Sequence, residues 1–158
     1  MIVTMTETHL DALMPYEQEM FGPEAWSRQS YAREIADTAL RHYLAVEDED
    51  GTLLGWGGVM VIGSSAELLT IGVVPQARRR GLATDLLHAL LETARGRGAV
   101  EIFLEVREDN EVARAFYDRE GFERLRLRRG YYDNGRVNGI EMRLALTPDT
   151  DRTAGAGT

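Results

Sequence analysis

The sequence has no cysteine, no lysine and no long apolar run. The absence of cysteine excludes a disulfide framework, a thiolate metal site and a cysteine nucleophile. A membrane-spanning helix needs roughly 18 consecutive apolar residues, and no segment reaches that length. The N-terminus carries Glu7 and Asp11 where a signal peptide has positive charge followed by an apolar segment. These absences indicate a cytoplasmic protein that does not bind a membrane.

The 158 residues are 44% hydrophobic and 28% charged, which is the ordinary composition of a folded globular protein. A chain of this length is typical of one domain, and we place that domain at residues 1–146. The segment 147–158 contains Pro148 and finishes in alanine, glycine and threonine. We expect this segment to be a disordered tail.

The net charge of −8 is unevenly distributed along the chain. Residues 1–77 carry 3 arginines against 12 acidic residues, whereas residues 78–146 carry 14 arginines against 12 acidic residues. An acidic protein is a poor general binder of nucleic acid, because such binding usually requires a basic face. The acidic first half instead favours a cationic substrate.

Hydrophobic periodicity and turn residues predict two helices and a strand meander in the first half of the chain. We expect a strand at Ile2–Met5, a helix at His9–Phe21, a second helix capped by Ser27 that carries Tyr31, Ile35 and Ala39, and strands at Tyr43–Glu47, Leu53–Ile62 and Ala66–Val74. Pro75 is expected to stop the last of these strands.

In the second half, helices alternate with strands. We expect a helix at Gly81–Arg95, a strand at Val100–Val106, a helix capped by Asn110 and ended by Gly121, and strands at Phe122–Arg128 and Val137–Leu146. The order β-α-α-β-β-β-α-β-α-β-β combines a meander with a βαβ crossover. It predicts an α/β fold with a central mixed sheet flanked by helices.

The segment from Val73 to Ala83 joins a strand to the strongest predicted helix and has three arginines before Gly81. The N-terminus of a helix has unpaired N–H groups and a partial positive charge, so it binds phosphate. The segment lacks both the Gly-Lys-Ser/Thr of a P-loop and the glycine spacing of a Rossmann fingerprint. By itself it indicates either an anion site or a solvated arginine run, of which the solvated run is commoner.

Arg78-Arg79-Arg80-Gly81-Leu82-Ala83 fits the Gln/Arg-x-x-Gly-x-Gly/Ala signature of the GCN5-related N-acetyltransferase (GNAT) family. Together with the predicted element order, the sequence resembles this family over residues 1–146. Other motifs resemble its ribosomal-protein-alanine (RimI-like) branch: Leu104-Glu105-Val106-Arg107, Asn110 with Ala113, Ala115-Phe116-Tyr117 with Gly121-Phe122, Arg128-Arg129-Gly130-Tyr131-Tyr132 and, more loosely, Pro23-Glu24-Ala25-Trp26-Ser27. The chain departs from the common pattern at Val74, Ala83 and Gly130.

The resemblance implies acetyl-coenzyme A (acetyl-CoA) as the acetyl donor. Its pyrophosphate would lie on the backbone N–H groups at the start of the helix. Its pantetheine arm would lie along the preceding strand as an added strand does, where that strand separates from the next. The coenzyme-binding residues implied in this way are Ile71, Gly72, Val73, Arg78, Arg79, Arg80, Gly81, Leu82, Ala83, Thr84 and Asn110, the last of which is also a helix N-cap.

Acetyl transfer needs a neutral amine, so a substrate ammonium must first lose a proton. Glu105 matches the family's base position, and a partly dry carboxylate can serve as that base, directly or through water. In a strand its face is shared with Phe103 and Arg107. The alternative from spacing alone is a surface glutamate paired with an arginine.

The leaving thiolate needs a proton or a hydrogen bond, and Tyr117 matches the family's general-acid position. A phenol with a pKa near 10 can donate to the developing thiolate. The alternative is a core aromatic beside Phe116. Because adjacent residues do not share a helix face, one of the two rings is expected in the core and the other can face the cleft.

Trp26, Tyr131 and Tyr132 are candidate walls of a peptide pocket, with plain packing as the alternative for each. His9, His42 and His88 have no metal-ligand spacing, and we expect no metal.

The function expected is acetylation of a protein N-terminal α-amine, in particular the N-terminal alanine of a ribosomal protein, as the resemblance implies. One alternative is an acetyltransferase for lysine side chains or a small polyamine, because the fold says little about the pocket. Another is a non-catalytic acyl-CoA sensor. The presence of Glu105, Tyr117 and the Arg78–Ala83 signature argues against the sensor.

Overall fold

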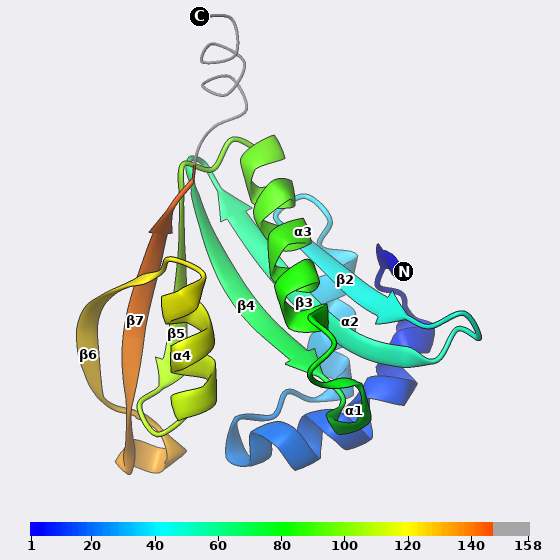
Figure 1. Cartoon of the computed structure of the whole chain (residues 1–158), viewed down its shortest axis with the longest axis horizontal. Helices are drawn as coiled ribbons and strands as arrows, with labels where there is room; N and C mark the ends of the chain where they lie inside the picture. The colour runs from blue at the N-terminus through cyan, green and yellow to red at the C-terminus, as the bar shows by residue number, and fades with distance from the viewer. Residues whose placement is uncertain (147–158) are drawn as a thin grey trace, which may run out of the picture.

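A computed structural model of the chain describes residues 1–146 (Figure 1). In chain order, the elements are β1 (Ile2–Thr4), α1 (Glu7–Phe21), α2 (Arg28–Ala36), β2 (Arg41–Glu47), β3 (Leu53–Ile62), β4 (Ser65–Val73), α3 (Leu82–Gly96), β5 (Glu101–Arg107), α4 (Glu111–Arg119), β6 (Glu123–Tyr132) and β7 (Val137–Ala145). Short 3₁₀ turns lie at Gly22–Glu24, Pro75–Ala77 and Asp133–Gly135. The predicted order of helices and strands is confirmed, and the predicted tail at 147–158 lies outside the described residues.

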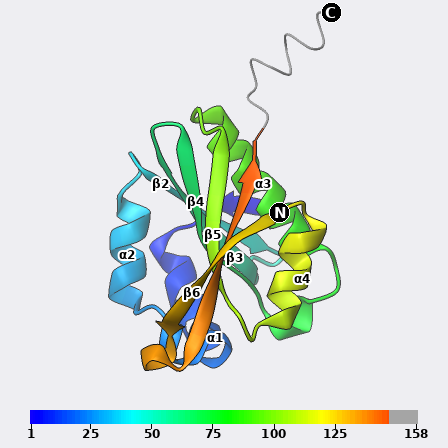
Figure 2. The same ribbon diagram turned by 90° about the vertical axis from the view of Figure 1, so that its left-hand side faces the viewer.

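The strands form one seven-stranded sheet in the order β1-β2-β3-β4-β5-β7-β6. Neighbouring strands are antiparallel, except that β4 and β5, which α3 connects, are parallel. Figure 2 shows α2 on one side of the sheet and α3 and α4 on the other. The mixed sheet flanked by helices is therefore confirmed.

Each face of the sheet has its own hydrophobic core. Strand β2 shows how this arises, because four consecutive residues of it are buried and alternate residues point to opposite faces. Tyr43 and Ala45 pack with α1 and α2, whereas Leu44 and Val46 pack with the leucines of α3. The core under α3 and α4 continues across β5 and β7.

Both predicted helix caps are present. The Ser27 hydroxyl accepts a hydrogen bond from the Ser30 backbone N–H at 3.0 Å, and the Asn110 side chain accepts one from the Ala113 N–H at 3.1 Å. Such caps satisfy N–H groups that have no partner within the helix.

Several predicted boundaries are shifted by one or two residues, and two are wrong by more than that. Helix α2 ends at Ala36, because Asp37 leaves the helical conformation and its carboxylate pairs with Arg41, so Ala39 lies outside the helix. Strand β6 continues past Arg128 to Tyr132, which pairs with Val137 across a register shift. Gly130, at a φ of +61°, provides the left-handed conformation within that irregular stretch.

The central feature for function is the separation of β4 from β5. The two strands pair only between residues 65–67 and 101–103. Beyond this short ladder β4 continues along β3 and β5 continues along β7, and the two diverge toward the lower part of Figure 1. The separation expected from the family resemblance is thus present, and it leaves one edge of β4 open.

Candidate active site

The loop before α3 presents unpaired backbone donors at a helix N-terminus. Gly81 is the N-cap at a φ of +78°, and the first helical hydrogen bond runs from the Asp85 N–H to the Gly81 carbonyl at 3.0 Å. The N–H groups of Leu82, Ala83 and Thr84 therefore precede the first acceptor within the helix. This arrangement can bind an anion.

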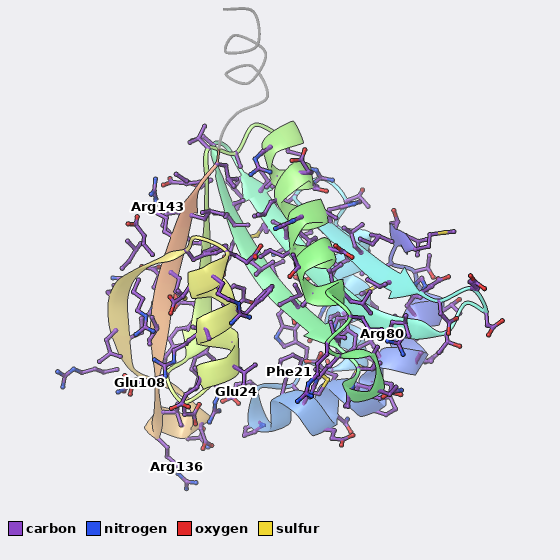
Figure 3. The ribbon with its side chains drawn as sticks, in the orientation of Figure 1. Phe21, Glu24, Arg80, Glu108, Arg136 and Arg143 are labelled. Carbon is purple, nitrogen blue, oxygen red and sulfur yellow. The ribbon has the colours of Figure 1, made fainter. Side chains whose placement is uncertain are left out.

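The three arginines of the signature surround this N-terminus and are exposed. Arg78 Nε donates to the Val73 carbonyl at 3.3 Å, which holds that side chain against the end of β4. Arg79 has a φ of +67°, an unusual value for a residue other than glycine. Figure 3 shows Arg80 on the loop that leads into α3. The positive charge is therefore concentrated beside the free N–H groups.

Ile71, Gly72 and Val73 lie on the part of β4 that has left β5. They pair on one side with Gly57, Trp56 and Gly55 of β3. Their other side has no strand partner among the described residues. An extended ligand can add to such an edge by main-chain hydrogen bonds.

Glu105 lies on β5, on the face opposite α3 and α4. Alternate residues of β5 are buried, and Leu104 and Val106 belong to the core under these helices. The Glu105 side chain is 14% exposed, and its Oε1 accepts a hydrogen bond from Arg128 Nη1 at 2.7 Å. Its Oε2 is buried and has no hydrogen-bond partner. Glu105 is therefore paired with an arginine, as the alternative expects, and has one oxygen without a partner; its role as the base stays a prediction.

The electrostatic surroundings of Glu105 are mixed. Burial raises the pKa of Glu105, and the nearby Glu141 also raises it, whereas Arg128 lowers it. A cavity of about 330 Å³ lies here, and Glu105, Arg128 and Glu141 line it together with Glu67 and Tyr131. Burial raises the pKa of Glu67 as well. The cavity therefore combines three carboxylates with one guanidinium, a setting suited to a cationic group.

Tyr117 lies on α4, in the core on the other side of β5 from Glu105. Its ring centroid is 5.2 Å from that of Phe116 and 5.5 Å from that of Phe122. Burial raises the pKa of the Tyr117 hydroxyl, which keeps it protonated at neutral pH. The structure thus buries Tyr117 and leaves Phe116 half-buried, and it does not bring Tyr117 into contact with Glu105.

The three candidate wall residues do not form one surface. Tyr131 lines the cavity, and the Arg128 guanidinium lies 4.8 Å from its ring centroid. Tyr132 packs edge-on against Tyr131 at 4.9 Å. Trp26 instead packs on Tyr31 at 5.0 Å, in the α1–α2 region, and does not line the cavity.

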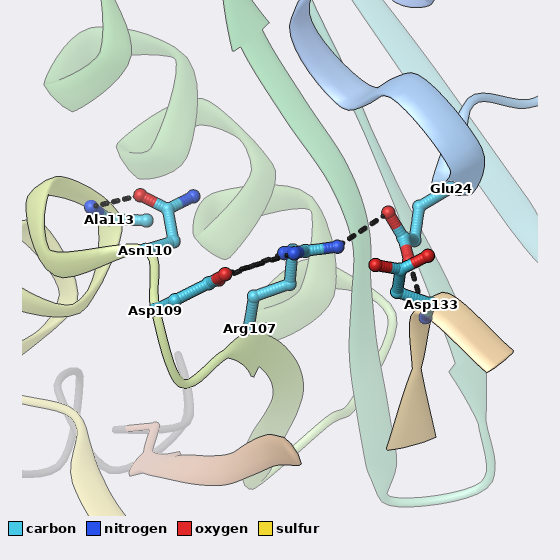
Figure 4. Close-up of polar contacts among 6 residues, drawn as sticks. All are labelled: Glu24, Arg107, Asp109, Asn110, Ala113 and Asp133. Atoms are coloured by element: carbon cyan, nitrogen blue, oxygen red, sulfur yellow. Dashed lines mark hydrogen bonds and ion pairs between the residues drawn. The ribbon is translucent and has the colours of Figure 1, made fainter. Parts of the chain in front are cut away.

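Sequence analysis missed the ionic cluster around Glu24. Arg107 Nη1 donates to one Glu24 carboxylate oxygen at 2.8 Å, and the Asp133 backbone N–H donates to the other at 2.9 Å (Figure 4). Arg107 also pairs with Asp109. Through these hydrogen bonds, Glu24 connects the turn before α2 with the end of β5 and with the turn between β6 and β7. Both Glu24 and Arg107 stand in motifs noted above, but no local pattern pairs residues so distant in sequence.

Sequence analysis also missed a buried carboxylate, Glu17. It is 2% exposed and accepts hydrogen bonds from the Tyr31 hydroxyl at 2.5 Å and from the Trp26 backbone N–H at 3.0 Å. Trp56 Nε1 in turn donates to the Tyr31 oxygen at 3.2 Å. Burial raises the pKa of Glu17. The signal was its position on the apolar face of a helix, where a charge needs partners.

Within residues 1–146, no group of three or more histidine or acidic residues is arranged to hold a metal ion. None of the helices among these residues has the length and apolar character needed to cross a membrane.

The structure thus places a helix N-terminus beside a strand with an open edge, and a carboxylate in a cavity on the face of the sheet opposite that helix. The sequence model of the acetyltransferase (GNAT) family matches residues 9–122. The chain belongs to this family.

Within this family, the chain is similar to enzymes that acetylate protein N-termini. The chain is 37% identical over 145 residues to N-alpha-acetyltransferase RimI of Mycobacterium tuberculosis, covering 89% of this chain and 87% of that protein. It is 30% identical over 148 residues to the [ribosomal protein bS18]-alanine N-acetyltransferase of Escherichia coli K12, covering 92% and 97% of the two chains. The crystal structure of the Escherichia coli ribosomal-protein-S18-alanine N-acetyltransferase superimposes with a TM-score of 0.82 at 29% identity and covers 93% of this chain and 94% of its own. The protein is an acetyl-CoA-dependent N-acetyltransferase that resembles the RimI enzymes.

Proposed function

We propose that the protein acetylates the N-terminal α-amine of a protein, with the N-terminal alanine of a ribosomal protein as its physiological target and the cytoplasm as its location. The observation that carries this proposal is similarity to two enzymes named for such activity over nearly the full length of each chain. Similarity of that extent includes the acceptor side of the sheet as well as the coenzyme signature.

The donor site follows from the free donors described above. The N–H groups from Arg79 to Thr84 bind the pyrophosphate of acetyl-CoA, and the exposed side chains of the arginine triplet add positive charge. The pantetheine arm pairs with the open edge of β4 at Ile71–Val73. Asn110 contacts the coenzyme from the start of α4. The acetyl thioester then lies where β4 and β5 separate.

The proposed base and the proposed acid lie on opposite faces of β5. Glu105 takes a proton from the substrate ammonium, directly or through water, and the neutral amine attacks the thioester carbonyl. The new N–C bond forms as the C–S bond breaks, and the thiolate takes a proton from Tyr117. The nitrogen gives up its second proton to solvent, and solvent returns a proton to Tyr117. Placement of the two groups on opposite faces of β5 is consistent with an acceptor that arrives on one face and a leaving group that departs on the other.

The acceptor side favours a basic peptide. Residues 1–77 have 3 arginines against 12 acidic residues, and three carboxylates line the cavity beside Tyr131. Tyr131 forms a wall of the acceptor site and Tyr132 packs against it, whereas Trp26 packs on Tyr31 away from the cavity. Attraction between opposite charges raises the local concentration of a basic N-terminal segment.

The test is release of free thiol from acetyl-CoA with three acceptors in parallel. The first is a basic peptide with a free N-terminal alanine and no lysine, the second is the same peptide with a blocked N-terminus and an internal lysine, and the third is spermidine. We expect thiol release with the first alone. Release with only the second or the third would overturn the proposed acceptor, and acetyl-CoA binding without release from any of them would favour a non-catalytic sensor.

A further inference from the structure

We propose that Arg128 is a positioning residue that binds one oxygen of Glu105 and leaves its second oxygen for the substrate proton. This inference rests on the proposed role of Glu105 as the base. Arg128 is not itself expected to touch the reacting atoms.

The geometry separates the two oxygens of Glu105. Arg128 Nη1 lies 2.7 Å from Oε1, whereas Oε2 is buried and without a partner. An unpaired carboxylate oxygen that has lost its water is a strong proton acceptor, because a new hydrogen bond restores what burial removed. A carboxylate bound through one oxygen cannot rotate freely, so the free oxygen keeps a fixed position.

Arg128 is itself held on two sides. Its guanidinium carbon lies 4.8 Å from the Tyr131 ring centroid, and its Nη1 lies 3.8 Å from Glu141 Oε2. A planar guanidinium can stack on a ring and bind a carboxylate at the same time. The arginine is therefore aimed at Glu105 by β6 and β7 together, although its own side chain is 36% exposed.

Other charged groups also face Glu105, and their signs predict different effects. The charged groups besides Arg128 are Glu67 on β4, Glu141 on β7 and Arg126 on β6, and the uncharged phenols of Tyr131 and Tyr132 on β6 also face it. The carboxylates disfavour ionisation of Glu105, and the arginines favour it. Arg128 is the one that hydrogen-bonds to it, whereas Arg126 pairs with Glu141 at 3.0 Å and is 62% exposed.

Removal of Arg128 should therefore leave Glu105 facing two carboxylates, with Arg126, which is itself paired with Glu141, as the remaining arginine that acts on it. Its pKa should rise, so that less of the base is ionised at a given pH. A charge partner at hydrogen-bond distance changes a carboxyl pKa by about 1 to 3 units, and partial exposure of Arg128 favours the lower end. The Arg128→Lys variant keeps the charge and should move the pKa less than Arg128→Gln.

The first measurement is an NMR titration of the full-length protein with carbon-13-labelled glutamate carboxyl groups, with the Glu105 signal assigned by its loss in Glu105→Gln. We expect the Glu105 titration to move up in pH by about 1 unit in Arg128→Gln. Arg126→Gln, which removes the same charge from the same strand, should move it less. Glu141→Gln, which removes a neighbouring carboxylate, should move it down.

The second measurement is the pH dependence of kcat/KM with the alanine peptide. We expect its acidic limb to move up in Arg128→Gln and back toward wild type in Arg128→Lys, with the KM for acetyl-CoA unchanged. An unmoved Glu105 titration in Arg128→Gln, or an equal shift in Arg126→Gln, would overturn the assignment. The titration does not require turnover, so it tests the effect of Arg128 on Glu105 even in a protein that acetylates no peptide. Failure to acetylate any peptide would contradict the proposed function instead.

Discussion

At the scale of single residues, the environment of each group determines its chemistry. Glu105 and Glu141 are register partners on neighbouring strands, yet only Glu105 has a buried oxygen without a hydrogen-bond partner. Tyr117 has a pKa raised by burial, which suits a donor more than a nucleophile. The same two residues could be an ordinary surface glutamate and a core tyrosine, and two variants separate these possibilities.

Glu105→Gln should lower kcat/KM most at low pH. An α-amine has a pKa near 8, so below pH 8 most of the acceptor carries the proton that Glu105 is proposed to remove. Burial raises the pKa of Glu105. As the pH falls below the pKa of Glu105, the carboxylate is protonated, and the difference in kcat/KM between wild type and variant should become smaller. The measurement is the ratio of wild-type to variant kcat/KM across pH. A ratio that does not change with pH would remove Glu105 from proton transfer.

Tyr117→Phe should lower kcat with little change in acetyl-CoA affinity. The variant keeps the ring that contacts Phe116 and Phe122, and it loses only the hydroxyl. An interaction made mainly with the leaving group affects kcat more than binding. Steady-state kinetics and calorimetric titration with acetyl-CoA test this, with the melting temperature as the folding control. Wild-type turnover in this variant would show that Tyr117 serves packing alone.

At the scale of elements, the proposed coenzyme site depends on the start of α3 and on the open edge of β4. The N-terminus of α3 needs a left-handed residue at Gly81, and a Cβ there would meet no atom within 4 Å. The constraint at this position is therefore backbone conformation and not space. The other end of the same helix offers a matched position, because Gly96 also has open space but no positive φ.

Gly81→Ala should destabilise the protein by about 1 kcal/mol, the cost of a left-handed conformation for alanine, and should weaken acetyl-CoA binding. Gly96→Ala should be neutral or stabilising, because alanine is the better helix former. Urea unfolding and acetyl-CoA titration of both variants make the comparison. Equal effects at the two ends of α3 would contradict a special role for the Gly81 conformation.

At the scale of the whole molecule, a few long-range contacts join the N-terminal helices to the C-terminal hairpin. Glu24 contacts Arg107 and Asp133, which lie 83 and 109 residues away. Tyr131 and Tyr132 lie just before Asp133, so this contact helps to position the proposed acceptor wall. The coenzyme signature lies elsewhere, at the start of α3.

Glu24→Gln should therefore raise the KM for the acceptor peptide several-fold and leave the KM for acetyl-CoA unchanged. The loss of the Glu24 charge weakens its hydrogen bonds to Arg107 and to the Asp133 N–H by about 1 kcal/mol, within the usual range for a hydrogen bond. Arg107→Gln should act similarly, and the double variant should be little worse than either single one, because both remove the same interaction. Additive effects in the double variant would show that the two residues act separately.

Much of the fold was predictable because its signals are local. The helix stripe of α3, the Ser27 and Asn110 caps and the turns between β2, β3 and β4 each depend on a short window, and the order of elements followed from them. The end of α2 was missed because an acidic residue four positions before an arginine also fits a continuing helix, whereas Asp37 leaves the helix and its carboxylate pairs with Arg41 at the start of β2. The Arg78–Ala83 signature and Glu105 were found because they stand in contiguous motifs.

The sequence by itself determined the elements, the family and the residues that carry its motifs, because all of these are written in neighbouring positions. Only the tertiary structure decided which groups meet. Strand order places β7 and β6 beside β5, and this brings Glu141 and Arg128 to Glu105. The alternation of β5 separates Glu105 from Tyr117, and the close approach of distant turns joins Glu24 to Arg107. These contacts depend on strand register and sheet order, which are set by packing of the whole chain and not by any short segment of it.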